Sequence, residues 1–522
     1  MSRIQHLQEI VAQKDARIAA VEARNAELEA LVKFYEEQFK LAKIREFGSS
    51  SEKGPLPDQI DLFDEVEVTA DISIAEPPLE EISYTRRKRK GKREDDLSTL
   101  PVEVIDHTLP EEEQLCPECG FGLHVMGHDY RQELVIIPAQ VKVVEHRRLT
   151  YACRHCERNG ERVPIVKASV PQPLISGSLA SASAVAYIMT QKYVMHVPLY
   201  RQEQEWHRLG YDLNRQTMAN WVIRCAEDWL DPIYARMREL LLKQEVLHCD
   251  ETTTQVLREP GKTATSKSYM WLYRTSGDTK HAIVQYEYQP SRSHSHPQRF
   301  LKDFKGYLHA DGYSGYNHLP NAIIRIGCWA HMRRKWMDAL KGIPKESRGA
   351  SVSDEALKRI GYLFHLEYIW RMLTPEERYE RRLEESKPLA EEFYVWLSTV
   401  NALPKSAVGE AVQYALSQKQ WLMNVYLDGR TELSNNRAEN SIRPFTLGRK
   451  NWLFAATVRG AQASATVYSI IETAKANGLK PYEYLEFLFK TLPNVTSSAI
   501  DSLLPWGDAI PQHFKMSVLE QP

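Results

Sequence analysis

Residues 1–47 contain neither Gly nor Pro, and their apolar positions recur with the heptad spacing of one long amphipathic helix. With Ile4 at position a, five of the six a positions are apolar, and the exception is Asn25. An Asn at one a position favours a two-stranded register, so we expect a dimeric coiled coil. Lys14 at a d position weakens the seam, and the alternative is a helix packed on its own chain.

Residues 48–105 have no sustained periodicity and are rich in Ser, Pro and charged residues, which predicts a flexible linker. Nine acidic residues and no basic one lie between Asp58 and Glu81, and the basic run Arg86–Arg93 follows. This basic run is either a solvated tether or a non-specific contact to DNA phosphates.

Two apolar runs within residues 106–170, Leu134–Ile137 and Val141–Val144, predict short strands. The same segment carries two Cys-x-x-Cys pairs, which are Cys116 with Cys119 and Cys153 with Cys156. Four thiolates complete the tetrahedral shell of one zinc ion and leave no open position. The spacing therefore predicts a structural zinc ribbon and not a catalytic metal centre.

Residues 171–242 have a helical pattern. Pro198 suits the first position of one helix, Gly210 ends it, and Asn214 can cap a second. This order predicts a helix-turn-helix region that binds DNA, although any helical bundle offers such a turn. In the DNA-binding interpretation, the second helix exposes Arg215, Gln216, Asn220 and Arg224.

A strand pattern begins at residue 243. The strand-like runs are Glu245–Cys249, Tyr269–Tyr273, His281–Tyr286, Lys305–Ala310 and Ala322–Ile326. Three strands, a helix, and two further strands before another helix is the order of a ribonuclease-H-like α/β sheet. Asp250 follows the first strand and Asp311 the fourth, so adjacent strand ends would bring the two carboxylates together. A divalent metal ion would offset the repulsion between them.

A third acid, Glu439, lies in a Ser/Asn-rich entry to a helix within residues 431–480. Three such carboxylates can hold two Mg²⁺ ions about 4 Å apart, and Mn²⁺ is an expected substitute. Nearby basic residues could contact a phosphodiester substrate, and these are Arg437, Arg443, Arg449 and Lys450. The simpler alternative is that Asp250 caps a helix and Asp311 forms a plain turn.

Residues 343–430 turn to a charged helical pattern and predict an insertion between the two catalytic segments, 243–342 and 431–480. Cys328 and His331 have the spacing of metal ligands, but the sequence offers no third ligand beside them. The favoured interpretation is a strand end and a helix start in a core. Residues 481–522 form a tail that could dock on the catalytic domain or on a partner.

Composition adds limits. The 522 residues are 43% hydrophobic and 26% charged, with a formal net charge of −2, which excludes a chain that is disordered or collagen-like throughout. No apolar run approaches the ~20 residues that span a bilayer, and no signal-peptide core is present. We therefore expect a soluble protein of the cytoplasm without membrane contact.

A series of collinear motifs runs through the chain. They are Phe47-Gly48 with Ser51–Lys53, Cys116–Gly120, Lys192-Tyr193, Pro198–Gln202, Thr217 with Trp221, Asp250–Thr252, Asp311–Tyr313, Cys328–Lys335, Asn435–Glu439 and Gly448–Phe454. In these motifs the chain resembles transposases of the insertion sequence 66 family, bacterial enzymes of the DDE type. The resemblance implies a leucine-zipper-like N-terminus, a zinc finger, a helix-turn-helix and a ribonuclease-H-like catalytic domain with a helical insertion.

The resemblance places the family's catalytic acids on Asp250, Asp311 and Glu439, as ligands of two Mg²⁺ ions. It implies hydrolysis at the transposon 3′ end, followed by attack of that 3′-OH on target DNA. Terminal inverted repeats would be bound by the zinc ribbon and the helix-turn-helix, and the coiled coil would form a dimer or a higher oligomer. Accessory proteins of the same element are further expected partners. Asn440 departs from the family, in which we expect Arg, so a DNA contact there is in doubt.

Two other functions fit the same residues. A ribonuclease-H-like, structure-selective nuclease would cleave DNA without joining it. A DNA-binding regulator would keep the sheet only as a relict scaffold, although the three acids and the basic residues around Glu439 count against this alternative.

Overall fold

The computed structural model describes residues 104, 139–152, 158, 165–343, 348–349, 351–495 and 499–516. The predicted coiled coil, nearly all of the predicted linker and the four cysteines of the predicted zinc ribbon lie outside these residues. These three features therefore stay predictions.

A small hairpin is present in the zinc-ribbon segment. Strands β1 (Thr150–Ala152) and β2 (Ile165–Lys167) pair antiparallel, with Tyr151 opposite Val166. The strand predicted at Val141–Val144 is wrong, because those residues have no regular structure and Val143 is 90% exposed. Strand propensity acts through packing on a half-buried surface, and this run lies on no such surface. The run Leu134–Ile137 lies outside the described residues.

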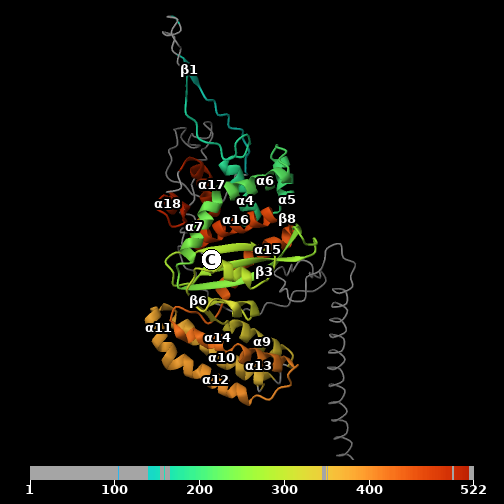
Figure 1. Ribbon diagram of the computed structural model, residues 1–522, viewed down its shortest axis with the longest axis vertical. Helices are drawn as coiled ribbons and strands as arrows, with labels where there is room; N and C mark the ends of the chain where they lie inside the picture. Colours follow the sequence, from blue (N-terminus) through green and yellow to red (C-terminus); the bar gives the residue numbers. More distant parts are fainter. Residues whose placement is uncertain are drawn as a thin grey trace, which may run out of the picture. The chain divides into compact units, whose positions relative to one another are not determined.

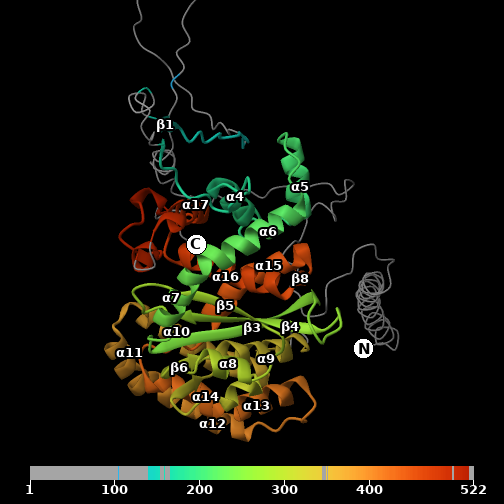
Figure 2. The same ribbon diagram turned by 45° about the horizontal axis from the view of Figure 1, so that its top comes forward.

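A mixed sheet with the order β5-β4-β3-β6-β7 forms the centre of the larger part (Figures 1 and 2). Its strands are β3 (Val246–Arg258), β4 (Lys267–Thr275), β5 (Val284–Gln289), β6 (Gly306–His309) and β7 (Ile323–Ile326). The first three strands pair antiparallel, whereas β6 runs parallel to β3 and β7 parallel to β6. All five predicted strands are therefore present, in the predicted order with helix α8 (Ser295–Phe300) before β6.

Strand β3 is longer than the sequence predicted. It continues through Asp250, and its polar second half pairs with β4 as far as Gln255 opposite Lys267. Asp250 is thus inside a strand and not at its end. The polar run after Cys249 suggested a strand end, but these residues line the part of the sheet where the acids gather, so their polarity reflects the site.

The other edge of β3 is covered in two places with a gap between them. Strand β6 pairs with Val246–His248, and β8 (Ala455–Thr457) pairs with β3 from Val256 to Arg258. Helix α15 (Asn436–Trp452) lies along the gap, where Arg449 Nη1 donates to Thr252 Oγ1 over 3.0 Å and also to the Thr253 carbonyl.

Helix α16 (Val458–Ala476) packs directly on β5. Its Ser469 and Thr473 hydroxyls accept the backbone N–H groups of Tyr286 and Val284 over 2.8 and 3.0 Å. These bonds satisfy the free edge of β5, which would otherwise expose unpaired donors. In both Figures 1 and 2, α15 and α16 lie on one side of the strands and the insertion helices gather on the opposite side.

The predicted helix-turn-helix elements are present as helices. They are α5 (Leu199–Arg208) and α6 (Arg215–Cys225), preceded by α4 (Ala182–Tyr193) and followed by α7 (Asp231–Leu241). Asn214 caps α6 as predicted, its side chain accepting the N–H of Thr217 over 2.8 Å. Gly210 has a φ of 92°, which suits a glycine in the turn. Pro198 is the N-cap of α5 and not its first helical residue, a shift of one position.

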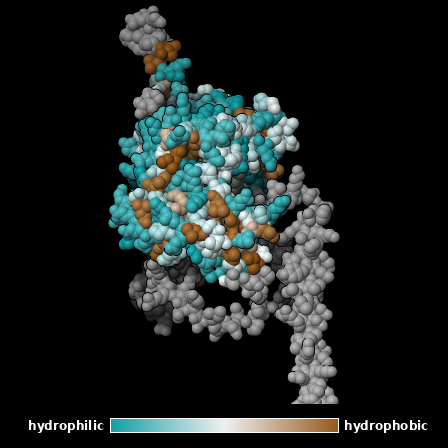
Figure 3. Space-filling model, turned by 60° about the horizontal axis from the view of Figure 1, so that its bottom comes forward, coloured by the Kyte–Doolittle hydropathy of each residue, from teal (hydrophilic) through white to brown (hydrophobic). Residues whose placement is uncertain are grey.

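Residues between β7 and α15 are helical, as the sequence predicted. The main helices are α9 (Trp329–Lys341), α10 (Val352–Ile369), α11 (Pro375–Arg381), α12 (Lys387–Thr399), α13 (Ala407–Ser417) and α14 (Lys419–Met423). They share a core of their own around Trp329, Trp336 and Phe393. Figure 3 shows a face on which apolar residues are scattered among hydrophilic ones.

The C-terminal residues pack on their own chain, in line with the first of the two alternatives that the sequence left open. Helix α17 (Pro481–Thr491) lies against α4, and Leu485, Leu488 and Phe489 are buried in the same core as the sheet. Tyr484 donates from its hydroxyl to the Leu503 carbonyl over 2.8 Å. None of the helices in the described part of the chain combines the length and apolar character needed to cross a membrane.

Candidate active site

Asp250 lies in β3, and Asp311 follows the end of β6, the strand that runs parallel to β3. The last residues paired between β3 and β6 are His248 and His309. If this register is extended by two residues along both segments, Asp250 lies beside Asp311. The Asp250 carboxylate accepts the N–H of Glu251 over 2.8 Å, and the Asp311 carboxylate accepts the N–H of Tyr313 over 3.0 Å. The backbone therefore orients both side chains.

The charges at this position are crowded. The pKa of Asp250 is raised well above its usual range, first by burial and then by the negative charges of Glu251, Asp311 and Glu439. The pKa of Glu251 is raised as well, by burial and by Asp311, against hydrogen bonds from Tyr316 and Arg292. A divalent cation would relieve this repulsion, and carboxylate oxygens are the ligands that Mg²⁺ and Mn²⁺ prefer. The residues present therefore fit a divalent metal ion.

Glu439 reaches the same region from the first turn of α15. The residue before this helix, Asn435, is 1% exposed and connects three segments. Its side chain donates to the Cys249 carbonyl over 2.8 Å and accepts from His248 Nδ1 over 3.0 Å, and its backbone N–H donates to Cys328 Sγ over 3.2 Å. Asn435 therefore positions the start of α15 against β3 and the start of α9.

Two side chains of α9 contact Glu439. His331 Nε2 lies 3.4 Å from Glu439 Oε1, and Arg334 Nη2 donates to Oε2 over 3.1 Å. Cys328 completes a group whose ligand atoms all lie within 4.8 Å of one another. The favoured interpretation of Cys328 and His331, a strand end and a helix start in a core, is confirmed, because buried Cys328 lies between β7 and α9. The sequence did not reveal Glu439 as a third possible ligand, because the insertion folds back and brings it beside them. Among the described residues, the three predicted acids do not form a group this tight.

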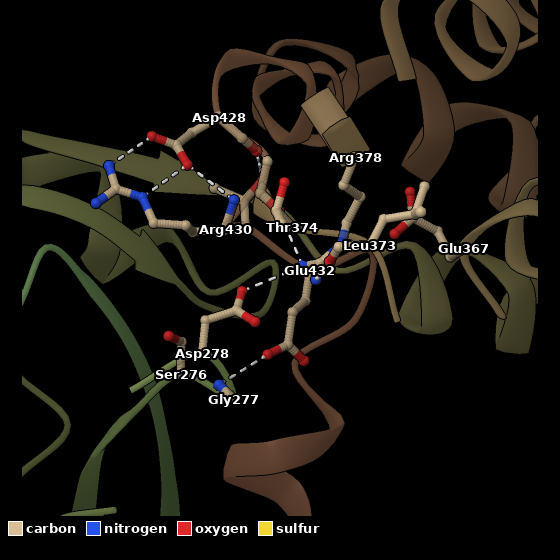
Figure 4. A network of polar contacts seen from close by, with 12 residues as sticks. Ser276, Gly277, Asp278, Glu367, Leu373, Thr374, Arg378, Asp428, Arg430 and Glu432 are labelled. Atoms are coloured by element: carbon tan, nitrogen blue, oxygen red, sulfur yellow. Dashed lines mark hydrogen bonds and ion pairs between the residues drawn. The ribbon is translucent and has the colours of Figure 1, made fainter. Parts of the chain in front are cut away.

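A network of ion pairs ties the insertion to the segment that leads into α15 (Figure 4). Arg378 of α11 lies 3.1 Å from Asp278 in the β4–β5 connection and donates to the Gly429 carbonyl over 3.0 Å. Glu432 accepts the N–H of Gly277 over 3.3 Å. Helix α11 and the segment that leads into α15 are thus both held against the β4–β5 connection.

The predicted DNA-contacting residues near Glu439 differ in what they contact. Arg437 donates to Glu432 over 2.5 Å, and Arg449 donates to Thr252, so each has a partner within the chain. Arg443 and Lys450 are exposed on α15. On α6, the side chains predicted to face DNA are all exposed, and these are Arg215, Gln216, Asn220 and Arg224.

Arg292 was missed by the sequence reasoning. Its guanidinium donates to Glu251 over 2.7 Å, lies 3.9 Å from an Asp311 oxygen and stacks over the Tyr313 ring at 3.9 Å. It follows β5 in a Ser- and His-rich loop, where no pattern separates it from a surface Arg. Its 41% exposed side chain leaves it accessible to a polyanion beside the acids.

Crowding of the acids predicts an effect of Asp250→Asn on stability. The folded-state pKa is raised, so the contribution of Asp250 to stability is complete below the unfolded pKa of ~3.9 and is lost as pH rises through the folded pKa. At pH 7 without metal, Asp250→Asn is therefore expected to raise the melting temperature. Adding Mg²⁺ or Mn²⁺ is expected to stabilise the original chain more than the variant, as calorimetry with and without metal would show.

The control for this prediction is Asp303→Asn, which removes an exposed carboxylate elsewhere. Equal metal-induced shifts in the original chain and in Asp250→Asn would contradict metal binding at Asp250.

Four segments of the chain match models of known protein families. Residues 177–463 match the model of the transposase IS66 family, and residues 113–157 match the zinc-finger binding domain of transposase IS66. Residues 469–506 match the IS66 C-terminal element, and residues 35–105 match a segment described as transposase C of IS166 homeodomain.

Three relatives come from Sinorhizobium fredii. The uncharacterized protein y4qI is 31% identical over 95% of this chain and 94% of its own length. The uncharacterized proteins y4jD and y4hP are 30% and 31% identical, over 77% and 81% of this chain and 80% and 78% of their own lengths. With a family model that covers more than half of its residues, the chain belongs to the IS66 family of transposases.

Proposed function

We propose that this transposase binds the terminal inverted repeats of an insertion sequence and catalyses metal-dependent 3′-end cleavage and strand transfer at Asp250, Asp311 and Glu439. The observation that carries this proposal is the convergence of acids from β3, from the residues after β6 and from α15. Burial, together with the negative charges of Glu251, Asp311 and Glu439, raises the pKa of Asp250. Family membership supports DNA as the partner and implies a divalent metal ion and a zinc-binding finger.

We further propose that the sheet is ribonuclease-H-like. Support comes from three antiparallel strands followed by two strands parallel to the first, with the insertion between residues 243–342 and 431–480. Preceding it, residues 106–170 would form the zinc ribbon through Cys116, Cys119, Cys153 and Cys156, and residues 1–47 would form a dimeric coiled coil. The helix-turn-helix would span 171–242.

In this mechanism, the side chains of Asp250, Asp311 and Glu439 would hold two Mg²⁺ ions, which would supply activation of the nucleophile and charge stabilisation in the transition state. The nucleophile is water during cleavage and the new 3′-OH during joining. Backbone N–H bonds orient the two aspartates, and Asn435 positions the helix that carries the glutamate. Arg292 is placed to contact a phosphate oxygen of the bound strand.

The test is a cleavage and joining assay on DNA that carries the element's own ends, with the original chain and Glu439→Gln side by side. Joined product that disappears in Glu439→Gln is the expected result. Cleavage without joining would indicate a structure-selective nuclease. DNA binding without chemistry, even with the accessory proteins added, would indicate a regulator.

Binding of DNA by α6 gives a separate prediction. Arg215→Ala is expected to weaken binding to all sequences and to reduce the slope of log affinity against log salt by about 1, the loss of one phosphate contact. Asn220→Ala is expected to reduce discrimination between end and random DNA. Fluorescence anisotropy at several salt concentrations measures both, and Lys243→Ala, which removes an exposed charge after α7, is the matched control. Salt slopes unchanged by Arg215→Ala would exclude α6 as the contact.

A further inference from the structure

The group formed by Cys328, His331 and Glu439 contains donors that magnesium does not favour. Cys328 precedes α9, His331 lies in its first turn, and Glu439 lies in the first turn of α15. Their ligand atoms all lie within 4.8 Å of one another. Sulphur, nitrogen and one carboxylate together match the ligands of zinc and other transition metals.

The spacing is close to what a tetrahedral zinc ion requires. With Zn–N and Zn–O bonds of ~2.0 Å, the two ligand atoms in a tetrahedron lie ~3.3 Å apart. His331 Nε2 and Glu439 Oε1 lie 3.4 Å apart. A sulphur ligand at ~2.3 Å from the ion would lie ~3.5 Å from each of them, so Cys328 needs only a small side-chain movement.

Unsatisfied atoms provide a second observation. Glu439 Oε1 and His331 Nδ1 are both buried and have no hydrogen-bond partner. Buried polar atoms are normally paired, and a bound ion would satisfy the glutamate oxygen. Cys328 Sγ accepts the N–H of Asn435 over 3.2 Å, a bond that also stabilises a thiolate ligand.

The charges around the group can adapt to a cation. Arg334 lies 3.1 Å from the second glutamate oxygen, and its side chain is 55% exposed, so it can move into solvent. The positive charges of Arg334 and Lys335 oppose a cation beside His331, whereas the negative charges of Glu439 and Asp311 favour one. Three protein ligands leave a fourth position for water.

We propose that Cys328, His331 and Glu439 form a transition-metal site that binds Zn²⁺. Zinc bound there takes Glu439 away from the catalytic magnesium ions, so zinc inhibits cleavage; this second half rests on the proposed function. The site uses none of the cysteines of the predicted zinc ribbon, and its three ligands come together where α9 meets α15.

The first experiment measures bound zinc. The full-length chain and its variants are saturated with zinc, dialysed and analysed by atomic emission. Cys328→Ala and His331→Ala are each expected to bind one zinc ion fewer per chain than the original protein. The controls are Cys225→Ala, a buried cysteine of α6, and His318→Ala, an exposed histidine, and both should retain all zinc. Equal zinc content in all five proteins would overturn the site.

The two variants differ in their risk of misfolding, because the His331 side chain is 26% exposed whereas Cys328 is buried. Circular dichroism would check that both variants fold.

The second experiment titrates zinc into the magnesium-dependent cleavage assay. Inhibition of the original chain should require at least about tenfold more zinc in Cys328→Ala, since even outer partners of ligands change metal affinity by that factor. Equal inhibition of both would overturn the link to Glu439. Absence of cleavage in the original chain would count against the proposed function and leave the zinc measurement standing.

Discussion

Asp250→Asn is expected to reduce strand cleavage and joining by at least about 10³-fold, while DNA affinity stays unchanged. Asp250 lies inside β3, near Asp311, and burial and the neighbouring acids oppose its negative charge. Losing it removes a metal ligand, and stabilisation by bound metal is worth several kcal/mol, with ~1.4 kcal/mol for each factor of ten. Single-turnover cleavage rates and electrophoretic mobility shifts measure the two quantities.

Asp303→Asn is again the matched control, because it removes an exposed carboxylate and should cleave at the original rate. Asp250→Asn with normal cleavage would remove this residue from the active site. A parallel loss of DNA affinity would instead indicate that the substitution disturbs the fold.

Arg382→Met is expected to lower the free energy of unfolding by ~3–5 kcal/mol, the usual effect of breaking a buried ion pair. Arg382, in the turn after α11, is 1% exposed and makes two bonds of 2.7 Å to the carboxylate of Glu367. It also donates to the Asp428 and Thr431 carbonyls over 2.9 and 2.8 Å. The substitution removes one donor from each of these carbonyls and leaves the Glu367 carboxylate without its positive partner.

The double variant Arg382→Met/Glu367→Leu separates charge from packing. Removing both charges is expected to recover part of the loss, because no unpaired carboxylate remains. Urea unfolding followed by tryptophan fluorescence measures each variant, and Arg371→Met on the surface is the control. An effect of Arg382→Met no larger than that of Arg371→Met would contradict a central role for this ion pair.

The sheet could be predicted because its strands carry continuous apolar runs between turns. Asp250 and Asp311 could be paired for the same reason, since each follows an apolar run and parallel neighbours align their ends. The extent of β3 could not be predicted, because its second half is polar where it borders the acids. The strand predicted at Val141–Val144 is wrong for the opposite reason. These residues are apolar but exposed, and an apolar run alone does not supply a surface on which a strand can pack.

Contacts across the insertion were beyond sequence reasoning. His331 and Arg334 meet Glu439 only because about a hundred intervening residues fold back on themselves. Arg378 and Asn435 donate hydrogen bonds that hold the insertion and the start of α15 against the sheet. In the sequence, nothing distinguishes them from ordinary polar residues. Composition and periodicity identify elements, whereas a site of this kind depends on which helix ends meet.

The packing of α4 against the last helices has a consequence for incomplete chains. Tyr193 of α4 lies against Tyr468 of α16, with ring centroids 5.0 Å apart, and α4 also packs on α17. A ribosome that stopped before α16 would therefore release a product without the surface on which the helices before the sheet rest. Such a product is expected to be degraded and not to occupy transposon ends as a competitor. In this fold, the helices proposed to bind DNA and the acids proposed to cleave it become stable together, when synthesis reaches its last helices.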